Sequence, residues 1–373
     1  MKIFRYILPA LVILSSCEKL QTSPESGQRV ILDWPGYIWF DAEAPKTKTT
    51  AVTDMSDKSF NLIAFKYGSN WNTFKATGTP ASAMSDAEPY GFSFPTTVSC
   101  DADGVCDYDA SNGGAPVEWD GTQKYSFFAW HPATTNGTVS LTTGQSTAGV
   151  PAIKYTVPAA ESEGFINASN IPDVLIANTT DVQNTGAGVV SLNFSHALCL
   201  LTVEARNLKA GTIADISNLV MAITSQRYGN ITIPLDGSTA TPGDVTNNFK
   251  CRMQPTSGNG SSVPVPEFGI DGSSSNTSIS YPNYNTAYIP QGSELGELTG
   301  SLSFTVGFRN AAEPHNAIPT EEPNKVQTFE STKALEAGKK YAFVITIAAD
   351  ESISIAIIES GAWDEKTTDL IFE

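Results

Sequence analysis

The stretch KYAFVITIA, residues 340–348, carries the clearest strand pattern in the chain. Large apolar side chains alternate in it with smaller ones: Tyr341, Phe343, Ile345 and Ile347. Successive side chains of a β-strand point to opposite faces of the sheet, so this pattern predicts a strand with one face on a hydrophobic core and the other face less buried. Two packed antiparallel sheets are the expected arrangement.

Similar short runs, rich in Val, Ile, Phe, Tyr and Thr, recur along the chain between clusters of Gly, Asn, Asp, Ser and Pro. They span residues 37–40, 59–67, 124–132, 173–177, 189–205, 217–223, 229–235, 286–290, 300–308 and 352–358. We find no long stripe at helical spacing and no internal repeat, and long loops are expected at 101–122, 133–147 and 236–280. The sequence therefore predicts an all-β protein made of sandwiches with surface insertions.

The length of 373 residues is enough for two hydrophobic cores of ordinary domain size. The segment NTTDVQNTGAG, residues 178–188, interrupts the strand pattern and is a candidate boundary. We expect four parts, namely a signal peptide at 1–16, a flexible tether at 17–29, an N-terminal domain at 30–185 and a C-terminal domain at 186–373.

The N-terminal segment has the features of a lipoprotein export signal. Lys2 and Arg5 precede an apolar run at residues 7–14, which is too short for a bilayer that needs about 20 apolar residues. Leu14-Ser-Ser-Cys17 closes this run, so Cys17 is the predicted lipidation site and first mature residue. An ordinary secretory signal with an accidental cysteine is the alternative. Lipidation at Cys17 predicts a membrane-tethered protein.

Composition excludes some partners and supplies no enzyme motif. The formal net charge is −17, so nucleic acid is not an expected partner. The three histidines form no metal-binding or triad spacing, and HExxH, GxSxG, Walker A and strand-linked GxGxxG motifs are absent. A pair of glycosidase carboxylates cannot be recognised from spacing. We predict no catalytic residue, no metal site and no cofactor.

The cysteines suggest one disulfide. Cys100 and Cys106 flank the turn-like segment 101–105, and an exported protein can oxidise such a pair. Cys199 lies in an apolar run and is expected to be a small buried residue, whereas Cys251 is isolated. No pair of CxxC motifs is present, which disfavours a structural zinc site.

Three groups of side chains each allow two interpretations. Four aspartates in one loop form a calcium site or a solvated turn: Asp101, Asp103, Asp107 and Asp109. Tryptophans form core contacts or a sugar-stacking platform: Trp39, Trp71, Trp119, Trp130 and Trp363. For His196, flanked by apolar residues, a buried neutral ring with a backbone partner is favoured over a ligand. In each case the structural interpretation is the expected one.

Several of these segments, in this order, resemble the fimbrillin-like proteins, subunits and accessory proteins of the type V pili of Gram-negative bacteria. They are the lipoprotein leader, KYSFFAWHP (124–132), DVLIA (173–177), VVSLNFSHALCLLTV (189–203), LEAGKKYAFVITI (335–347) and the late Trp363. The resemblance covers nearly the whole chain. It implies two tandem transthyretin-like β-sandwich domains and a non-enzymatic subunit, carried as a lipoprotein to the outer membrane.

The resemblance also implies assembly by strand exchange, in which a protease removes the first strand and another subunit's terminal strand fills the groove. Here the removable strand is expected within 30–41, with Lys46 and Lys48 as candidate cleavage sites in an otherwise solvated linker. The family's cut follows arginine, which this linker lacks. Leu370 and Phe372 are the candidate donor residues, unless the C-terminal segment completes its own sheet.

The expected partners are other pilin subunits, the outer membrane through the lipid, and a surface receptor or glycan. Two other functions remain open on the sequence. One is an outer-membrane lipoprotein whose sandwiches bind glycans without cleavage or polymerisation. The other is a secreted hydrolase with concealed carboxylates.

Overall fold

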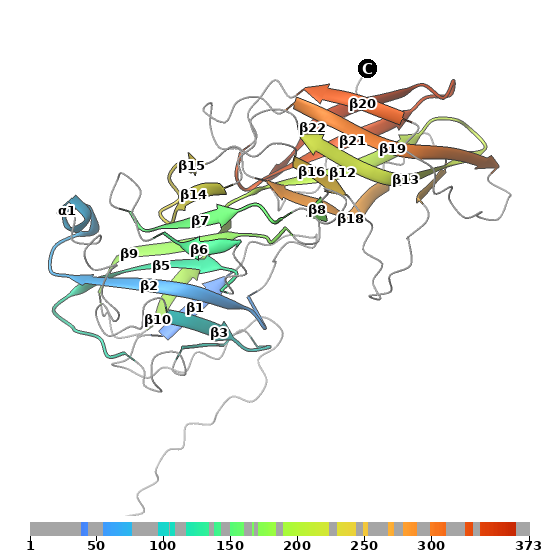
Figure 1. Ribbon diagram of the computed structural model, residues 1–373. Helices are drawn as coiled ribbons and strands as arrows, with labels where there is room; N and C mark the ends of the chain where they lie inside the picture. The colour runs from blue at the N-terminus through green and yellow to red at the C-terminus, as the bar shows by residue number, and fades with distance from the viewer. Residues whose placement is uncertain are drawn as a thin grey trace, which may run out of the picture. The chain divides into compact units, whose positions relative to one another are not determined.

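The structure, a computed structural model, describes seventeen segments of the chain. They are residues 39–43, 55–76, 96–103, 105–108, 117–133, 138–142, 150–159, 166–167, 171–183, 189–223, 230–243, 249–252, 268–271, 279–288, 299–310, 325–330 and 336–362. Nearly all of the regular structure in them is β-strand (Figure 1), which confirms the all-β fold. The helix α1 (Trp71–Ala76) breaks this pattern, and within these segments no helix is long and apolar enough to span a membrane.

A six-stranded antiparallel sheet organises the first half of the chain, in the order β11-β9-β5-β2-β3-β4. Its strands are β2 (Ser59–Tyr67), β3 (Thr96–Cys100), β4 (Cys106–Asp107), β5 (Lys124–His131), β9 (Leu175–Val182) and β11 (Ser195–His196). The central strands β2 and β5 lie side by side (Figure 1). They coincide with the predicted runs 59–67 and 124–132.

Both faces of this sheet are buried. On β2, Phe60 and Leu62 pack into one hydrophobic cluster, whereas Ile63 and Phe65 pack into a second cluster. All four side chains are fully buried. A strand covered on both faces has a continuous apolar run in place of alternation, which explains why residues 59–67 read as unbroken apolar sequence.

Two smaller sheets cover these faces. The parallel pair β1 (Trp39–Glu43) and β10 (Val189–Asn193) contributes Phe40, Val190 and Leu192 to the cluster that contains Phe60. The other cluster receives side chains from a sheet in the order β15-β14-β7-β6. Its strands are β6 (Val139–Leu141), β7 (Ala152–Thr156), β14 (Asn230–Pro234) and β15 (Thr241–Pro242).

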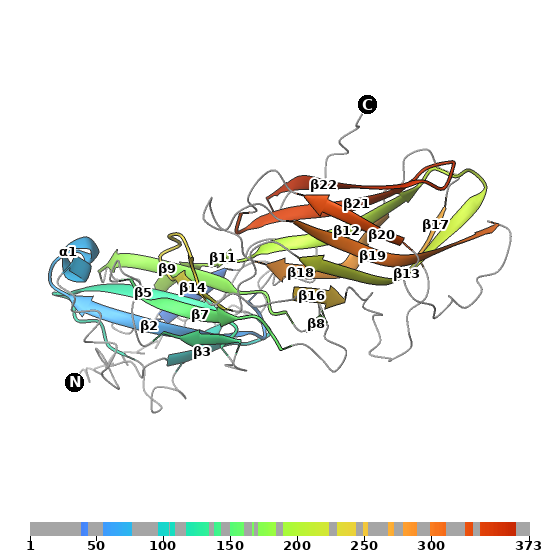
Figure 2. The same cartoon turned by 45° about the horizontal axis from the view of Figure 1, so that its top comes forward.

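The second half of the chain forms two further sheets, seen as layers in Figure 2. One has the order β18-β12-β21-β22, with β12 (Cys199–Asn207), β18 (Ile279–Tyr288), β21 (Lys339–Ile347) and β22 (Ile353–Ala362). The other has the order β20-β19-β13-β16-β8, with β17 also paired to β13. Its strands are β8 (Ile166–Asn167), β13 (Thr212–Ile223), β16 (Phe249–Arg252), β17 (Phe268–Asp271), β19 (Thr299–Asn310) and β20 (Lys325–Glu330).

The strand predicted at 340–348 is β21, one residue earlier at each end. Its predicted core residues, from Tyr341 to Ile347 in alternation, are at most 5% exposed. The opposite face is more buried than expected, since Ala342 and Val344 are 2% and 5% exposed. The expectation of purely antiparallel sheets was wrong, because β21 pairs in parallel with β12, as β1 does with β10.

Strand pairing crosses the expected domain boundary at residues 185 and 186. β10 and β11 pair with β1 and β9, and β14 pairs with β7. Residues 178–182 of the expected linker are themselves part of β9. The two-domain division remains a prediction, and any boundary must keep these strands with the sheets of the first half.

His196 lies where the chain leaves β11 for β12. It is 6% exposed, as expected, but the partner of its Nδ1 atom is the Asp173 carboxylate at 2.9 Å and not the expected backbone group. The amide of Ala197 donates to Val174 O at 2.8 Å. Cys199, the first residue of β12, is fully buried and has a free thiol. This short crossing is therefore fixed by both side-chain and backbone contacts.

Candidate subunit interface

β1 is held by a single neighbouring strand in the part of the chain that the structure describes. Its five residues run parallel to β10, from Trp39 opposite Val189 to Glu43 opposite Asn193. The two strands form a sheet of their own. A strand in this position leaves its sheet when one ladder of hydrogen bonds breaks.

The Phe40 side chain anchors β1 to the core. Its ring meets Tyr108 and Phe127 edge to face, with centroid distances of 5.5 and 5.3 Å. Phe40 is 5% exposed, and Ala42, two residues further along the same face, is fully buried. The seat of β1 therefore accepts a large aromatic side chain at one position and a small one at the next inward position.

The wall of the Phe40 site is itself well fixed. The Tyr108 hydroxyl accepts a hydrogen bond from Val117 N at 2.9 Å. Tyr125 stacks on Phe127, with centroids 5.9 Å apart, and Trp119 meets Tyr125 edge to face at 5.1 Å. Burial raises the pKa of Tyr125, so its hydroxyl stays neutral. These contacts hold the pocket independently of β1.

β10 is also attached to the core without help from β1. Val190 is 1% exposed and Leu192 is fully buried. The Thr179 hydroxyl of β9 donates to Ser191 O at 2.7 Å. If β1 departs, β10 therefore remains as a strand edge with unpaired backbone groups.

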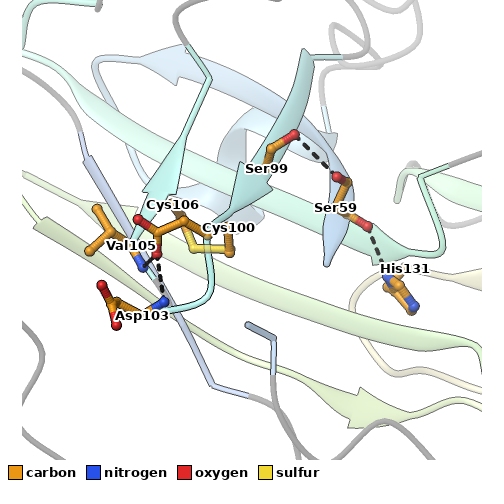
Figure 3. The surroundings of a disulfide bond; sticks show 8 residues. Ser59, Ser99, Cys100, Asp103, Val105, Cys106 and His131 are labelled. Atoms are coloured by element: carbon orange, nitrogen blue, oxygen red, sulfur yellow. Dashed lines mark hydrogen bonds between the residues drawn. A yellow bond between two sulfur atoms is a disulfide. The ribbon is translucent and has the colours of Figure 1, made fainter. Parts of the chain in front are cut away.

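A disulfide lies beside this cluster (Figure 3). Cys100 of β3 and Cys106 of β4 stand opposite each other in the antiparallel ladder, with their Cα atoms 3.9 Å apart and their sulfur atoms bonded. Both are buried in the same cluster as Phe40. The sequence predicts the same pair, and the bond ties the short edge strand β4 to β3, directly before Tyr108.

The aspartates between these cysteines stabilise a turn. The Asp101 carboxylate accepts hydrogen bonds from the amides of Asp103 and Val105, both at 2.9 Å. Asp101 O also accepts from Asp57 N at 3.0 Å. Nowhere in the described segments do three or more His, Cys, Asp or Glu side chains gather as metal ligands. The observed contacts are those of the turn interpretation.

The other predicted site residues lie outside the described segments. Cys17 precedes β1, Lys46 and Lys48 fall between β1 and the buried Met55, and Leu370 and Phe372 follow β22. Their roles remain predictions. In sequence, both lysines stand where a cut separates β1 from the rest of the chain.

Two tryptophans proposed for a sugar platform are core residues. Trp130 is fully buried and Trp71 is 5% exposed, and both belong to one hydrophobic cluster. Trp119 is half-buried against Tyr125. The Trp39 side chain and Trp363 lie outside the described part of the chain. Trp71 and Trp130 are therefore unavailable for stacking on a glycan.

The sequence interpretation missed the residues that form the Phe40 site. Tyr108 falls in the expected loop 101–122, and the inward face of Phe127 cannot be told from that of Phe128 because the whole run is apolar. The only local signal was the alternation within IWFDA at 38–42. The pairing of β1 with β10, 150 positions along the chain at Trp39 and Val189, depends on tertiary structure.

Comparison with known proteins identifies the family. The model of the fimbrillin-like family matches residues 77–360. The chain belongs to the fimbrillin-like family. No curated protein matches it. Among solved structures, this family member is similar to a fimbrial protein from Bacteroides vulgatus ATCC 8482, with 18% identity, a TM-score of 0.53, and coverage of 87% of this chain and 99% of that one.

A second structure has a similar fold. It is a "putative cell adhesion protein" from Bacteroides ovatus ATCC 8483, with 12% identity, a TM-score of 0.50, and coverage of 89% of this chain and 99% of that one. At these identities the likeness extends to the fold. The family is thus established by the family model, and the fold by the model and both structures.

Proposed function

We propose that this fimbrillin-like chain is a non-enzymatic structural subunit of a surface fimbrium, assembled by strand exchange. The observation that carries the proposal is the attachment of β1, which pairs with β10 alone in the described segments and inserts Phe40 into a preformed aromatic site. Family membership and the similarity to a fimbrial protein support a role at the cell surface. Cys17 would carry the lipid that delivers the precursor to the outer membrane.

In this mechanism a protease cuts the segment that holds Lys46 and Lys48, and β1 then leaves. Its departure exposes the edge of β10 and the aromatic site around Phe127. Fully burying an aromatic or aliphatic side chain contributes about 1.5–3 kcal/mol, so an empty groove is unfavourable. An incoming strand from another subunit restores both the ladder and the buried side chains.

The cut is tested by sequencing the N-terminus of the exported protein. Cutting after either lysine gives a start at Thr47 or Thr49. The variant with Lys46→Gln and Lys48→Gln should keep its N-terminus and stay monomeric, whereas the Lys→Arg pair at the same positions should be cut and polymerise. If the glutamine variant forms polymers of normal length, cleavage here is not the trigger and the proposal fails.

The lipid anchor has a separate test. Wild-type cells labelled with a fatty acid should yield a labelled precursor, and Cys17→Ala should be unlabelled and leave the membrane fraction. Cys17→Ala that stays membrane-bound, with an unlabelled wild type, would contradict the lipoprotein assignment. The strand-exchange test above does not depend on this result.

A further inference from the structure

The C-terminal segment repeats the sequence pattern of the strand that occupies the groove. Around Phe40 the chain reads Ile38-Trp39-Phe40-Asp41, and around Phe372 it reads Leu370-Ile371-Phe372-Glu373. Each is an aliphatic residue, a second hydrophobic residue, phenylalanine and an acid. Of the 18 phenylalanines in the chain, only these two have this surrounding.

The structure shows why phenylalanine is the informative position. Phe40 fills a site bounded by the edge-to-face rings of Tyr108 and Phe127, opposite Val190 of β10. Removing it leaves a hole shaped for one aromatic ring, and the loss of a buried phenylalanine is among the most costly core changes. A replacement strand that matches this site must place an aromatic ring opposite Val190.

We propose that the occupant of the vacated groove is the C-terminal segment of a second copy of this same chain, in the register that puts Phe372 in the place of Phe40. This rests on the proposed strand-exchange function and adds the partner and the register to it. The incoming strand runs parallel to β10. Phe372 then lies opposite Val190, and Leu370 takes the place of Ile38.

The register is tested with introduced cysteines in two mixed full-length proteins. The acceptor carries Val190→Cys and is cut by a lysine-specific protease. The donor carries Lys46→Gln and Lys48→Gln, so that its own groove stays filled, together with either Phe372→Cys or Leu370→Cys. Directly opposed residues are within disulfide reach, whereas a shift of two residues moves the partner by roughly 6.6 Å along the strand.

We expect disulfide-linked dimers from the Phe372→Cys donor and a yield about tenfold lower from the Leu370→Cys donor, because only the first pair is in register. Donors without an introduced cysteine and uncut acceptors are the controls for other thiols. In a donor with native cysteines, Phe372→Ala should weaken complex formation by roughly 100-fold.

Two opposite outcomes separate the register from the mechanism. If donor and acceptor associate on size exclusion but the Leu370→Cys donor cross-links better, or neither does, the register is overturned and strand exchange stands. If a cut acceptor associates with no donor, strand exchange itself fails and the register falls with it. Normal association of the Phe372→Ala donor also overturns the inference.

Discussion

The turn before β5 and the turn before β21 share one hydrogen-bonding arrangement. Asp120 N donates to the Tyr125 hydroxyl at 3.1 Å, and Glu336 N donates to the Tyr341 hydroxyl at 3.0 Å. In each case the acceptor tyrosine lies five residues after the donor. A tyrosine that folds its hydroxyl back onto the backbone fixes the start of a core strand in other β-sandwiches as well.

The two turns also share their backbone closure. Gln123 N donates to Asp120 O at 3.0 Å, and Lys339 N donates to Glu336 O at 3.3 Å. The sequences DGTQKYSF (120–127) and EAGKKYAF (336–343) align on an acid, Lys-Tyr and Phe. The sequence alone showed no repeat, because the shared feature is a pattern of hydrogen bonds carried by few identical residues.

The turns differ in what surrounds them. Gly338 adopts a left-handed conformation, with φ of +72°, whereas Thr122 at the same position in the first turn has an ordinary φ and donates through both N and Oγ1 to the Asp120 carboxylate. Phe127 lies under β1, and Phe343 lies in the other core cluster. One device therefore starts two strands, and only the first stands beside the proposed interface.

The largest expected effect comes from the two phenylalanines. Phe127→Ala and Phe343→Ala should each lower the free energy of unfolding by about 3–5 kcal/mol, because both side chains are fully buried. Only Phe127→Ala should speed amide exchange in Trp39–Glu43, since Phe40 loses its ring partner. Chemical denaturation and hydrogen exchange measure the two quantities. Equal loosening of β1 in both variants would remove the distinction between the turns.

The next effect has opposite signs in the two turns. Gly338→Ala should destabilise the protein by about 1–2 kcal/mol, because a Cβ is strained at positive φ. Gly121→Ala should stabilise it by roughly 0.4–1 kcal/mol, because its site is open and its φ is not in the left-handed region. Thermal denaturation of the pair measures both signs. A loss of stability in both variants would mean that the first turn also needs a glycine.

The tyrosine hydroxyls should have matching effects. Tyr125→Phe and Tyr341→Phe each remove the acceptor of one backbone amide, and we expect a loss of about 1 kcal/mol from each. Urea denaturation at neutral pH is the measurement. A loss confined to one variant would show that the shared geometry is not equally stabilising.

Tyr125 adds a dependence on pH. Burial raises its pKa above the ordinary 10.0, and burial raises the pKa of Tyr67 to about 12. The unfolded state then releases protons first as the pH rises, so the stabilisation is complete below pH 10 and declines between pH 10 and about 12. Tyr125→Phe should make this decline shallower, in unfolding curves recorded at each pH.

The smallest expected effect concerns the acids. Hydrogen bonds from the Thr122 hydroxyl and amide lower the pKa of Asp120, with a further contribution from Lys66. Its stabilisation is present above the ordinary pKa of 3.8 and is lost as the pH falls through the lower folded value. Asp120→Asn should flatten that acid limb slightly. Glu336→Gln serves as the matched control, and an equal change there would contradict the difference.

Several strands were predictable because their residues are apolar over a length that suits a strand. Residues 59–67 and 124–132 became β2 and β5, and 352–358 became most of β22. The run 189–205 was predicted as strand but divides into β10, β11 and β12. β7 and β20 and the six-residue α1 were missed, since short segments carry weak periodicity.

The sequence by itself determined the all-β class, the core face of β21, the disulfide candidate and the family resemblance, because these depend on alternation, short spacing and ordered local motifs. Tertiary structure decided which strands pair. The parallel ladders of β1 with β10 and of β12 with β21 join residues far apart in the chain, and no local pattern specifies such partners. The Phe40 site follows the same rule, because its ring partners come from β5 and from the segment after β4 and meet only when the sheet has formed.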